Sequence, residues 1–290
     1  MRAPSFGFIH ANDVETALDA LARHGDDAKL LAGGQSLGPM LNYHLIEPAV
    51  LVDVSRIPAL RVIAGDGAAV SIGASVTQAT IGASSEIWDT CPLLAQATRY
   101  VAHPAIRERG TIGGSLAHND PAGEYSSVLL ALDAKVRIRS ARGERVEDVA
   151  TLVEERFLET SLEPDELIVE VSVPRRAPHT GHAFLELSER VGDYAIAGAA
   201  ASVTVNPETG SVVSVRLCGI GGLFPRRLRA AEEELVGGPP SAGRLRAAAR
   251  AAAADFPAGD DIHATESYRR TLFAVLAFKA LAEAQATARG

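Results

Sequence analysis

Apolar residues recur at helical spacing near the start of the chain, at Val14, Ala17, Leu18 and Leu21. Residues 12–15, Asn-Asp-Val-Glu, resemble a capping box, and Gly25 marks the expected end of this helix. Short apolar runs at 29–32 and 50–54 predict two buried strands, the first running directly into a pair of glycines. We expect these segments to form a small α/β lobe.

Strand patterns become more frequent after this lobe. Apolar residues at 62–63 and 70–72 lie on either side of the turn Gly65-Asp66-Gly67. The periodicity further predicts helices over 92–101 and 128–132, and strands over 136–139 and 166–173. Pro174 is expected to close the last of these strands.

Residues 175–181 are the best candidate for an interdomain linker, because they contain one proline, one glycine and two arginines. Beyond it, apolar segments at 199–205 and 212–217 flank a hairpin signal at 206–210. Helices are expected over 244–254 and 267–286. Strands followed by helices predict an α+β fold for this second domain.

Composition narrows the class of protein. The 290 residues are 47% hydrophobic, and no apolar run approaches the roughly 18 residues of a membrane span. Because Met1–Pro4 lack the apolar stretch of a signal peptide, a cytoplasmic location is expected. The net charge of −8 and the lack of a basic run argue against a nucleic-acid partner.

The chain has two cysteines, Cys91 and Cys218, too few for the four thiolates of a conventional iron–sulfur cluster. We expect both to be buried, reduced thiols. His10, His103 and His118 fit no zinc spacing, so structural roles are favoured and no metal site is predicted. No nucleophilic triad can be inferred from sequence order, and no catalytic residue is assigned.

The first motif that could bind a ligand lies at the end of a predicted strand. It comprises Leu31, Ala32, Gly33, Gly34, Gln35 and Ser36. Glycines allow backbone N–H groups to converge on an anion, and the two polar side chains can bond phosphate oxygens. Taken alone, the same sequence is compatible with a plain turn.

A second motif repeats this chemistry later in the chain and comprises Gly110, Thr111, Gly113, Gly114 and Ser115. The two motifs together could hold the two ends of one pyrophosphate. Neither is a P-loop, because no Lys follows the glycine, and neither completes a G-x-G-x-x-G fingerprint. The phosphate hypothesis therefore depends on the pair.

Residues 32–36 and 111–121 resemble the hallmark motifs of the FAD-binding medium subunits of molybdenum hydroxylases, the carbon monoxide dehydrogenase and xanthine dehydrogenase family. The resemblance covers nearly the whole chain. It also includes residues 52–57, 106–110 and a C-terminal segment, 262–282, that contains Ser-Tyr-Arg-Arg at 267–270.

The resemblance implies an α+β chain with a two-lobed FAD-binding domain of the vanillyl-alcohol-oxidase type, followed by a smaller α+β domain. The FAD-binding domain would span residues 1–176, with lobes at about 1–57 and 58–176, and the C-terminal domain residues 177–290. The pyrophosphate of FAD would lie between the two glycine motifs.

The resemblance also implies roles for residues outside the glycine motifs. Glu124 would bond ribityl or ribose hydroxyls, where a surface carboxylate is the alternative. An apolar part of the cleft would be lined by Val101, Ala102, Ile106 and Ile168, although core packing alone also explains such residues. Tyr194 would approach the isoalloxazine ring, or else pack at a hairpin edge.

Two positions depart from the family pattern. Several relatives carry Lys near the position of Glu186, and relatives usually have Asn in place of Glu108. Both departures bear on the electronic environment of the flavin and on its electron acceptor.

The predicted function is that of an electron-transfer subunit of an oxidoreductase. FAD on this chain would take electrons from an iron–sulfur small subunit and pass them to an external acceptor, while molybdopterin would reside on a large subunit. The expected assembly is a dimer of heterotrimers. The alternatives are an independent flavin-dependent oxidoreductase and a non-enzymatic nucleotide-binding or assembly module.

Overall fold

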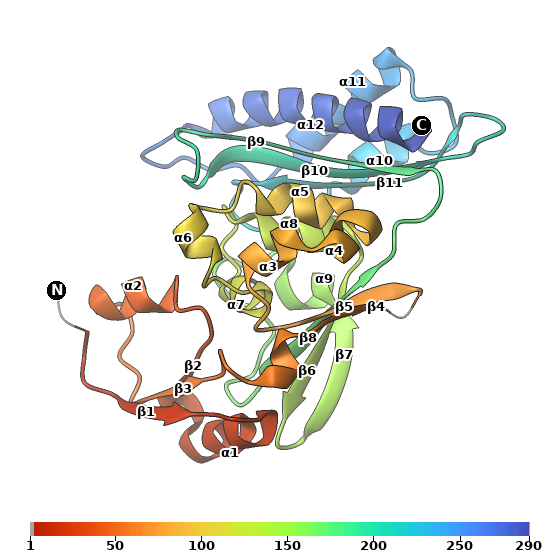
Figure 1. Cartoon of the computed structure of the whole chain (residues 1–290). Coiled ribbons are helices and arrows are strands. Elements are labelled where there is room, and N and C mark those ends of the chain that lie inside the picture. Colours follow the sequence, from red (N-terminus) through yellow and green to blue (C-terminus); the bar gives the residue numbers. More distant parts are fainter. Residues whose placement is uncertain (1–2, 66, 290) are drawn as a thin grey trace.

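Three β-sheets follow one another along the chain, each with its own set of helices (Figure 1). The structure is a computed structural model that describes residues 3–65 and 67–289. Met1, Arg2, Asp66 of the predicted turn 65–67, and Gly290 lie outside the described residues.

The first sheet is parallel, with β3 in the centre between β1 and β2. Asp13 caps the connecting helix, accepting a hydrogen bond from the Thr16 amide at 2.7 Å, and Gly25 ends it with φ of +53°. The elements are β1 (Gly7–His10), α1 (Val14–His24), η1 (Gly25–Asp27), β2 (Ala28–Leu31), α2 (Leu37–Asn42), β3 (Val50–Asp53) and η2 (Pro58–Arg61).

The second sheet is antiparallel, in the order β4-β5-β8-β6-β7. Its strands are β4 (Ile63–Gly65), β5 (Ala69–Gly73), β6 (Lys135–Ser140), β7 (Gly143–Asp148) and β8 (Leu167–Pro174). The helices of this lobe are α3 (Gln78–Ala83), α4 (Ser85–Thr90), α5 (Pro92–Thr98), α6 (Pro104–Arg107), α7 (Ile112–His118), α8 (Glu124–Ala131) and α9 (Val149–Val153). Along β6, buried Val136 and Ile138 alternate with paired arginines, as a half-buried strand requires.

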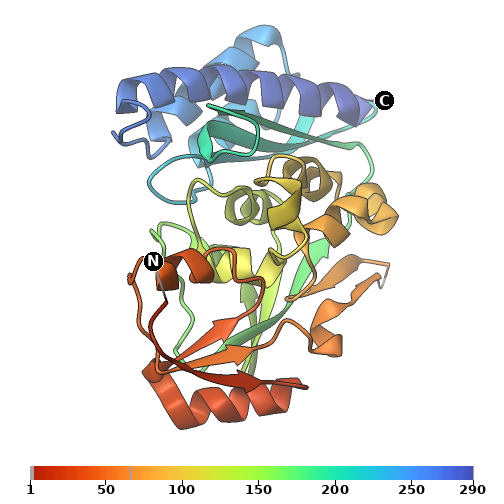
Figure 2. The same ribbon diagram turned by 60° about the vertical axis from the view of Figure 1, so that its left-hand side comes forward.

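The third sheet is an antiparallel meander, β11-β10-β9, and three helices follow it. Its elements are β9 (Thr180–Ser188), β10 (Ala195–Val205), β11 (Val212–Ile220), α10 (Arg229–Leu235), α11 (Ala242–Asp255) and α12 (Glu266–Arg289). The long α12 lies across the sheet, and Gly181 permits the contact, because a Cβ there would be 1.9 Å from the Ala284 carbonyl oxygen (Figure 2).

The opposite face of the third sheet closes the core of the middle lobe. Phe184, Ala200 and Cys218 belong to the same buried cluster as Leu94 and Val128 of the middle-lobe helices. The Ser127 hydroxyl of α8 also donates to the Gly219 carbonyl at 2.7 Å. The C-terminal sheet therefore fixes α8, which carries one end of the site described below.

The predicted elements are present with shifted ends. The helix predicted over 92–101 stops at Thr98, because the chain turns sharply and Ala102 takes φ of +37°. The proposed linker is shorter than expected, since Thr180 and Gly181 already pair with β10. Within the described residues, no helix combines the length and apolar character needed to cross a bilayer.

Candidate cofactor site

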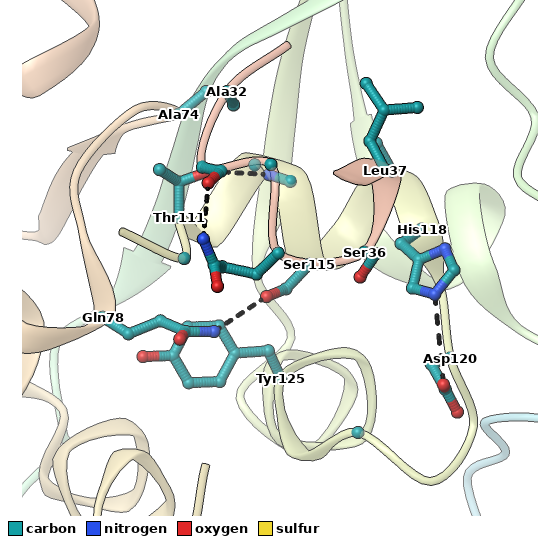
Figure 3. A pocket seen from close by; sticks show the side chains of 18 of the residues that line it. Ala32, Ser36, Leu37, Ala74, Gln78, Thr111, Ser115, His118, Asp120 and Tyr125 are labelled. Carbon is teal, nitrogen blue, oxygen red and sulfur yellow. Dashed lines mark hydrogen bonds and ion pairs between the residues drawn. The ribbon is translucent and has the colours of Figure 1, made fainter. Parts of the chain in front are cut away.

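A cavity of about 670 Å³ lies between the first two lobes, within the roughly 300–1,000 Å³ usual for small-molecule sites (Figure 3). Sequence-predicted residues that line it are Ala32, Gly33, Gly34, Gln35, Ser36, Val101, Ala102, Ile106, Gly110, Thr111, Gly113, Gly114, Ser115, Glu124, Ile168 and Tyr194. Leu31 is the exception. It does not line the cavity, and its Cδ1 lies 3.1 Å from the position of a Cβ on Gly34.

The first glycine loop (residues 32–36) and the second glycine loop (residues 110–115) touch backbone to backbone. A Cβ on Gly33 would lie 2.2 Å from the Arg109 carbonyl oxygen and 2.9 Å from the Gly110 Cα. A Cβ on Gly113 would lie 2.6 Å from that of Ala74. These glycines are therefore required for close approach of chain segments, and neither has positive φ.

The first glycine loop presents unpaired backbone donors. Within the described part of the chain, no hydrogen bond uses the N–H groups of residues 33–36. Gly34 adopts φ of +71°, which favours glycine, and the Gln35 amide Nε2 donates to the Gly33 carbonyl at 2.9 Å. Successive free N–H groups on a cavity wall are the donor set that an anionic oxygen requires.

The second glycine loop bonds most of its donors within the protein, and among the described residues only its Thr111 N–H lacks an acceptor. The Gly113 amide donates to the Ala74 carbonyl at 2.9 Å, and the Gly114 amide donates to the Thr111 hydroxyl at 3.1 Å. Thr111 thereby caps α7, as its position before the helix predicts. This loop shapes the wall, whereas the first loop supplies the free donors.

Gln78 was not predicted from the sequence, yet it lines the cavity and is 5% exposed. Its Nε2 donates to the Ser115 hydroxyl at 3.1 Å, while its buried Oε1 has no protein partner (Figure 3). The segment 74–78 reaches the site because Thr77 forms a bridge with Thr111. Gln78 lies between Thr77 and Ala79, and no local pattern in the sequence marked it as a site residue.

The apolar end of the cavity is held by one arginine. Arg107 Nη1 donates to the carbonyls of Val101 and Ala102 at 2.6 and 2.7 Å, which fixes the left-handed Ala102. Ile168 lines the wall from β8, and Tyr194 lies at the rim with 63% of its surface exposed. The cavity thus runs from polar loops to an apolar end.

Two carboxyl groups, those of Glu124 and Glu186, form no ion pair with any of the described residues. Glu124 begins α8 and is 7% exposed, and burial raises its pKa to about 7. Burial, followed by the charge of Glu124, raises the pKa of Glu186 to about 8, and its Oε2 has no partner. Glu108, the other departure from the family pattern, is exposed and does not line the cavity.

The three histidines that fit no zinc spacing have polar or packing partners, and His118 also lines the cavity. His10 pairs with Asp53 at 3.3 Å, His118 lies 4.0 Å from Asp120, and His103 packs against Gly192. Cys91 and Cys218 are buried free thiols, as expected, and burial raises the pKa of Cys91 to about 11.

These features fit FAD. Free N–H groups of residues 33–36 suit a pyrophosphate, and the unpaired Gln78 Oε1 and the Glu124 carboxyl suit hydroxyl or amide donors. The apolar end, with Ile106 and Ile168, suits a planar ring system.

Comparison with known proteins agrees with this fit. Residues 4–176 match the model of the FAD binding domain in molybdopterin dehydrogenase, and residues 182–284 match the CO dehydrogenase flavoprotein C-terminal domain. The chain is 42% identical over its whole length to the 6-hydroxypseudooxynicotine dehydrogenase complex subunit alpha of Paenarthrobacter nicotinovorans, covering 97% of that protein. It is 32% identical to the carbon monoxide dehydrogenase medium chain of Hydrogenophaga pseudoflava, with 97% of each covered.

Solved structures show the same relationship. Carbon monoxide dehydrogenase from Hydrogenophaga pseudoflava, in a form lacking the Mo-pyranopterin moiety, superimposes with a TM-score of 0.95 at 33% identity, covering 99% of both chains. Fold and site together define a flavoprotein subunit of an oxidoreductase. The chain belongs to the FAD-binding medium subunits of multi-subunit molybdenum hydroxylases.

The packing of the glycine loops predicts that an added methyl group lowers stability where backbone segments touch and not where the space is open. Gly33→Ala is expected to lower the free energy of unfolding by roughly 1–3 kcal/mol, because the new Cβ meets backbone atoms that cannot move independently. Gly38→Ala in α2, where nothing lies within 4 Å, is the matched control and is expected to be neutral or stabilising. Urea unfolding of both variants checks this, and equal stability of the two would contradict it.

The raised pKa of Glu186 predicts a pH-dependent stability. A carboxyl with a folded-state pKa near 8 binds its proton more tightly than in the unfolded chain, so stability falls as pH rises from about 4.5 through 8. Glu186→Gln is expected to flatten this decline and to gain roughly 1–3 kcal/mol at pH 9. The exposed Glu233→Gln is the control. Thermal unfolding between pH 6 and 9 tests this; parallel curves for wild type and Glu186→Gln would refute it.

Proposed function

We propose that this chain holds FAD in the cavity with the pyrophosphate against the first glycine loop. Bound FAD supplies reversible electron transfer, and the protein supplies binding, orientation and electrostatic tuning. The observation that carries this proposal is the set of unpartnered N–H groups at residues 33–36 on the cavity wall. In this arrangement the second glycine loop mainly keeps the first in place, since its N–H groups at residues 112–115 are already bonded.

We further infer individual roles from position in the cavity. Glu124 accepts hydrogen bonds from ribityl or ribose hydroxyls, and Gln78 offers an acceptor through its free Oε1. Val101, Ala102, Ile106 and Ile168 contact the ring system. Tyr194, at the rim of the cavity, shields the ring. Its exposure and its position in the cavity lining support this role.

The proposed architecture is a two-lobed FAD-binding domain of the vanillyl-alcohol-oxidase type over residues 1–176 and a C-terminal domain over residues 177–290. Support comes from the separate first and second sheets and from the two matched family models, which meet between residues 176 and 182. The C-terminal domain would stabilise α8 through the shared core around Phe184 and Cys218.

We propose that electrons arrive from a small subunit with [2Fe–2S] clusters, that molybdopterin resides on a large subunit, and that the unit is a dimer of cytoplasmic heterotrimers. Support comes from relatives described as a medium subunit or a complex subunit, and from the two cysteines of this chain, too few to ligate a cluster. The same descriptions disfavour an independent oxidoreductase and a non-enzymatic module. The final acceptor would be an external molecule.

Substitution at Gly34 tests the cofactor site. Gly34→Val forces a β-branched residue into φ of +71° and reorients the first glycine loop, so FAD affinity should fall at least about tenfold while the fold persists. Gly67→Val, at φ of +94° with nothing within 4 Å, is the matched control away from the cavity. Flavin fluorescence titration of the full chain provides the measurement.

Wild type should release all its flavin on acid precipitation, because neither glycine loop contains a His or Cys to which flavin could be linked. The isolated chain should bind FAD without oxidising a substrate of the complex. Wild-type affinity in Gly34→Val would overturn the pyrophosphate assignment, and robust substrate oxidation by the chain alone would overturn the subunit assignment.

A further inference from the structure

Asn119 ends α7 in an unusual way. It takes the left-handed conformation, with φ of +47°, and is fully buried. Its side-chain Nδ2 donates to three carbonyl oxygens, those of Val153, Arg156 and Glu159, at 3.1, 3.1 and 2.9 Å. Since these acceptors lie at the last residue of α9 and in the loop that follows it, a single amide gathers this loop around itself.

The start of the gathered segment is also held by the C-terminal domain, since the Glu155 amide donates to the Pro225 carbonyl and the Arg227 amide donates to Glu154 Oε1, both at 3.0 Å, but the middle of the segment has few other attachments. Glu155 and Leu158 both have positive φ, at +59° and +53°, so the backbone is strained where the amide holds it. Among the described residues, the one other hydrogen bond from residues 157–160 to a residue beyond the loop is that of the Leu162 amide to the Thr160 hydroxyl, at 3.3 Å. Leu158 nevertheless lines the cofactor cavity.

We propose that Asn119 is a positioning residue that clamps the loop 153–159 so that Leu158 forms part of the cavity wall. The same helix carries the second glycine loop at its other end, so α7 ties the wall to the packed glycine loops. That the wall faces FAD rests on the proposed function; that Asn119 holds the loop rests on the hydrogen bonds alone.

The chemistry of the position favours asparagine. The residue must adopt left-handed φ, which asparagine tolerates better than most residues, and must present two N–H donors at short range. Aspartate has nearly the same shape but offers only acceptors, which would repel the three carbonyls. Glycine keeps the backbone conformation and removes the amide.

Trypsin reports on the clamp, because it cleaves after Arg156 within the loop. In the full chain, Asn119→Gly and Asn119→Asp are expected to be cut there about tenfold faster than wild type, because the loop opens more often. His179→Gly replaces a residue with a similar left-handed φ, +56°, in the exposed linker and should be cut at the wild-type rate. Cleavage of Asn119→Gly at the wild-type rate would overturn the claim that Asn119 holds the loop.

Release of FAD, followed by recovery of flavin fluorescence, tests the second half of the proposal. Both Asn119 variants should release FAD several-fold faster than wild type and His179→Gly. The Leu158→Ala variant should also release FAD faster, while trypsin should cut this variant at the wild-type rate. This result would separate the contribution of Leu158 to the cavity wall from the role of Asn119 in holding the loop. It would also test the wall if the Asn119 variants do not fold.

Unchanged FAD release from Leu158→Ala would overturn the claim that Leu158 forms part of the cavity wall. Faster cleavage of Asn119→Gly without faster FAD release would overturn it as well. If wild type bound no FAD, the proposed function would fail, whereas the tryptic comparison would still decide the clamp.

Discussion

The backbone contact between the two glycine loops is the constraint on which the site depends. Gly33 lies against the Arg109 carbonyl so closely that a Cβ would be 2.2 Å from its oxygen. This contact joins the parallel lobe to the antiparallel lobe at the wall of the cavity. Because the second loop bonds the N–H groups of residues 112–115 within the protein, it acts as a rigid support, and the donors of residues 33–36 remain available to a ligand.

The rest of the chain positions the other end of the cavity. The C-terminal sheet packs against α8, which begins at Glu124, and it carries Glu186 beside that carboxyl. Arg107 sets the turn that presents Val101 and Ala102, and Asn119 gathers the loop that presents Leu158. This medium subunit of a molybdenum hydroxylase thus places a polar loop, an apolar end and the Glu124 carboxyl around one cavity.

Local patterns predicted the elements well, because helix caps such as Asp13 and alternating strands such as 136–139 are written in neighbouring residues. The glycine motifs also pointed to residues that do meet at one cavity. What the sequence could not reveal depends on contacts between distant segments. Gln78 reaches the site only through pairing of Thr77 with Thr111, and Leu31 turns away although it belongs to the motif.

Hydrogen exchange of the full chain, with and without FAD, tests the central claim that the first glycine loop supplies the free donors. The account predicts that amides of residues 33–36 exchange rapidly without FAD and become protected when it binds. Amides of residues 113–115 should be protected in both states, because they already bond within the protein. Unchanged exchange at residues 33–36 on FAD binding would contradict the account.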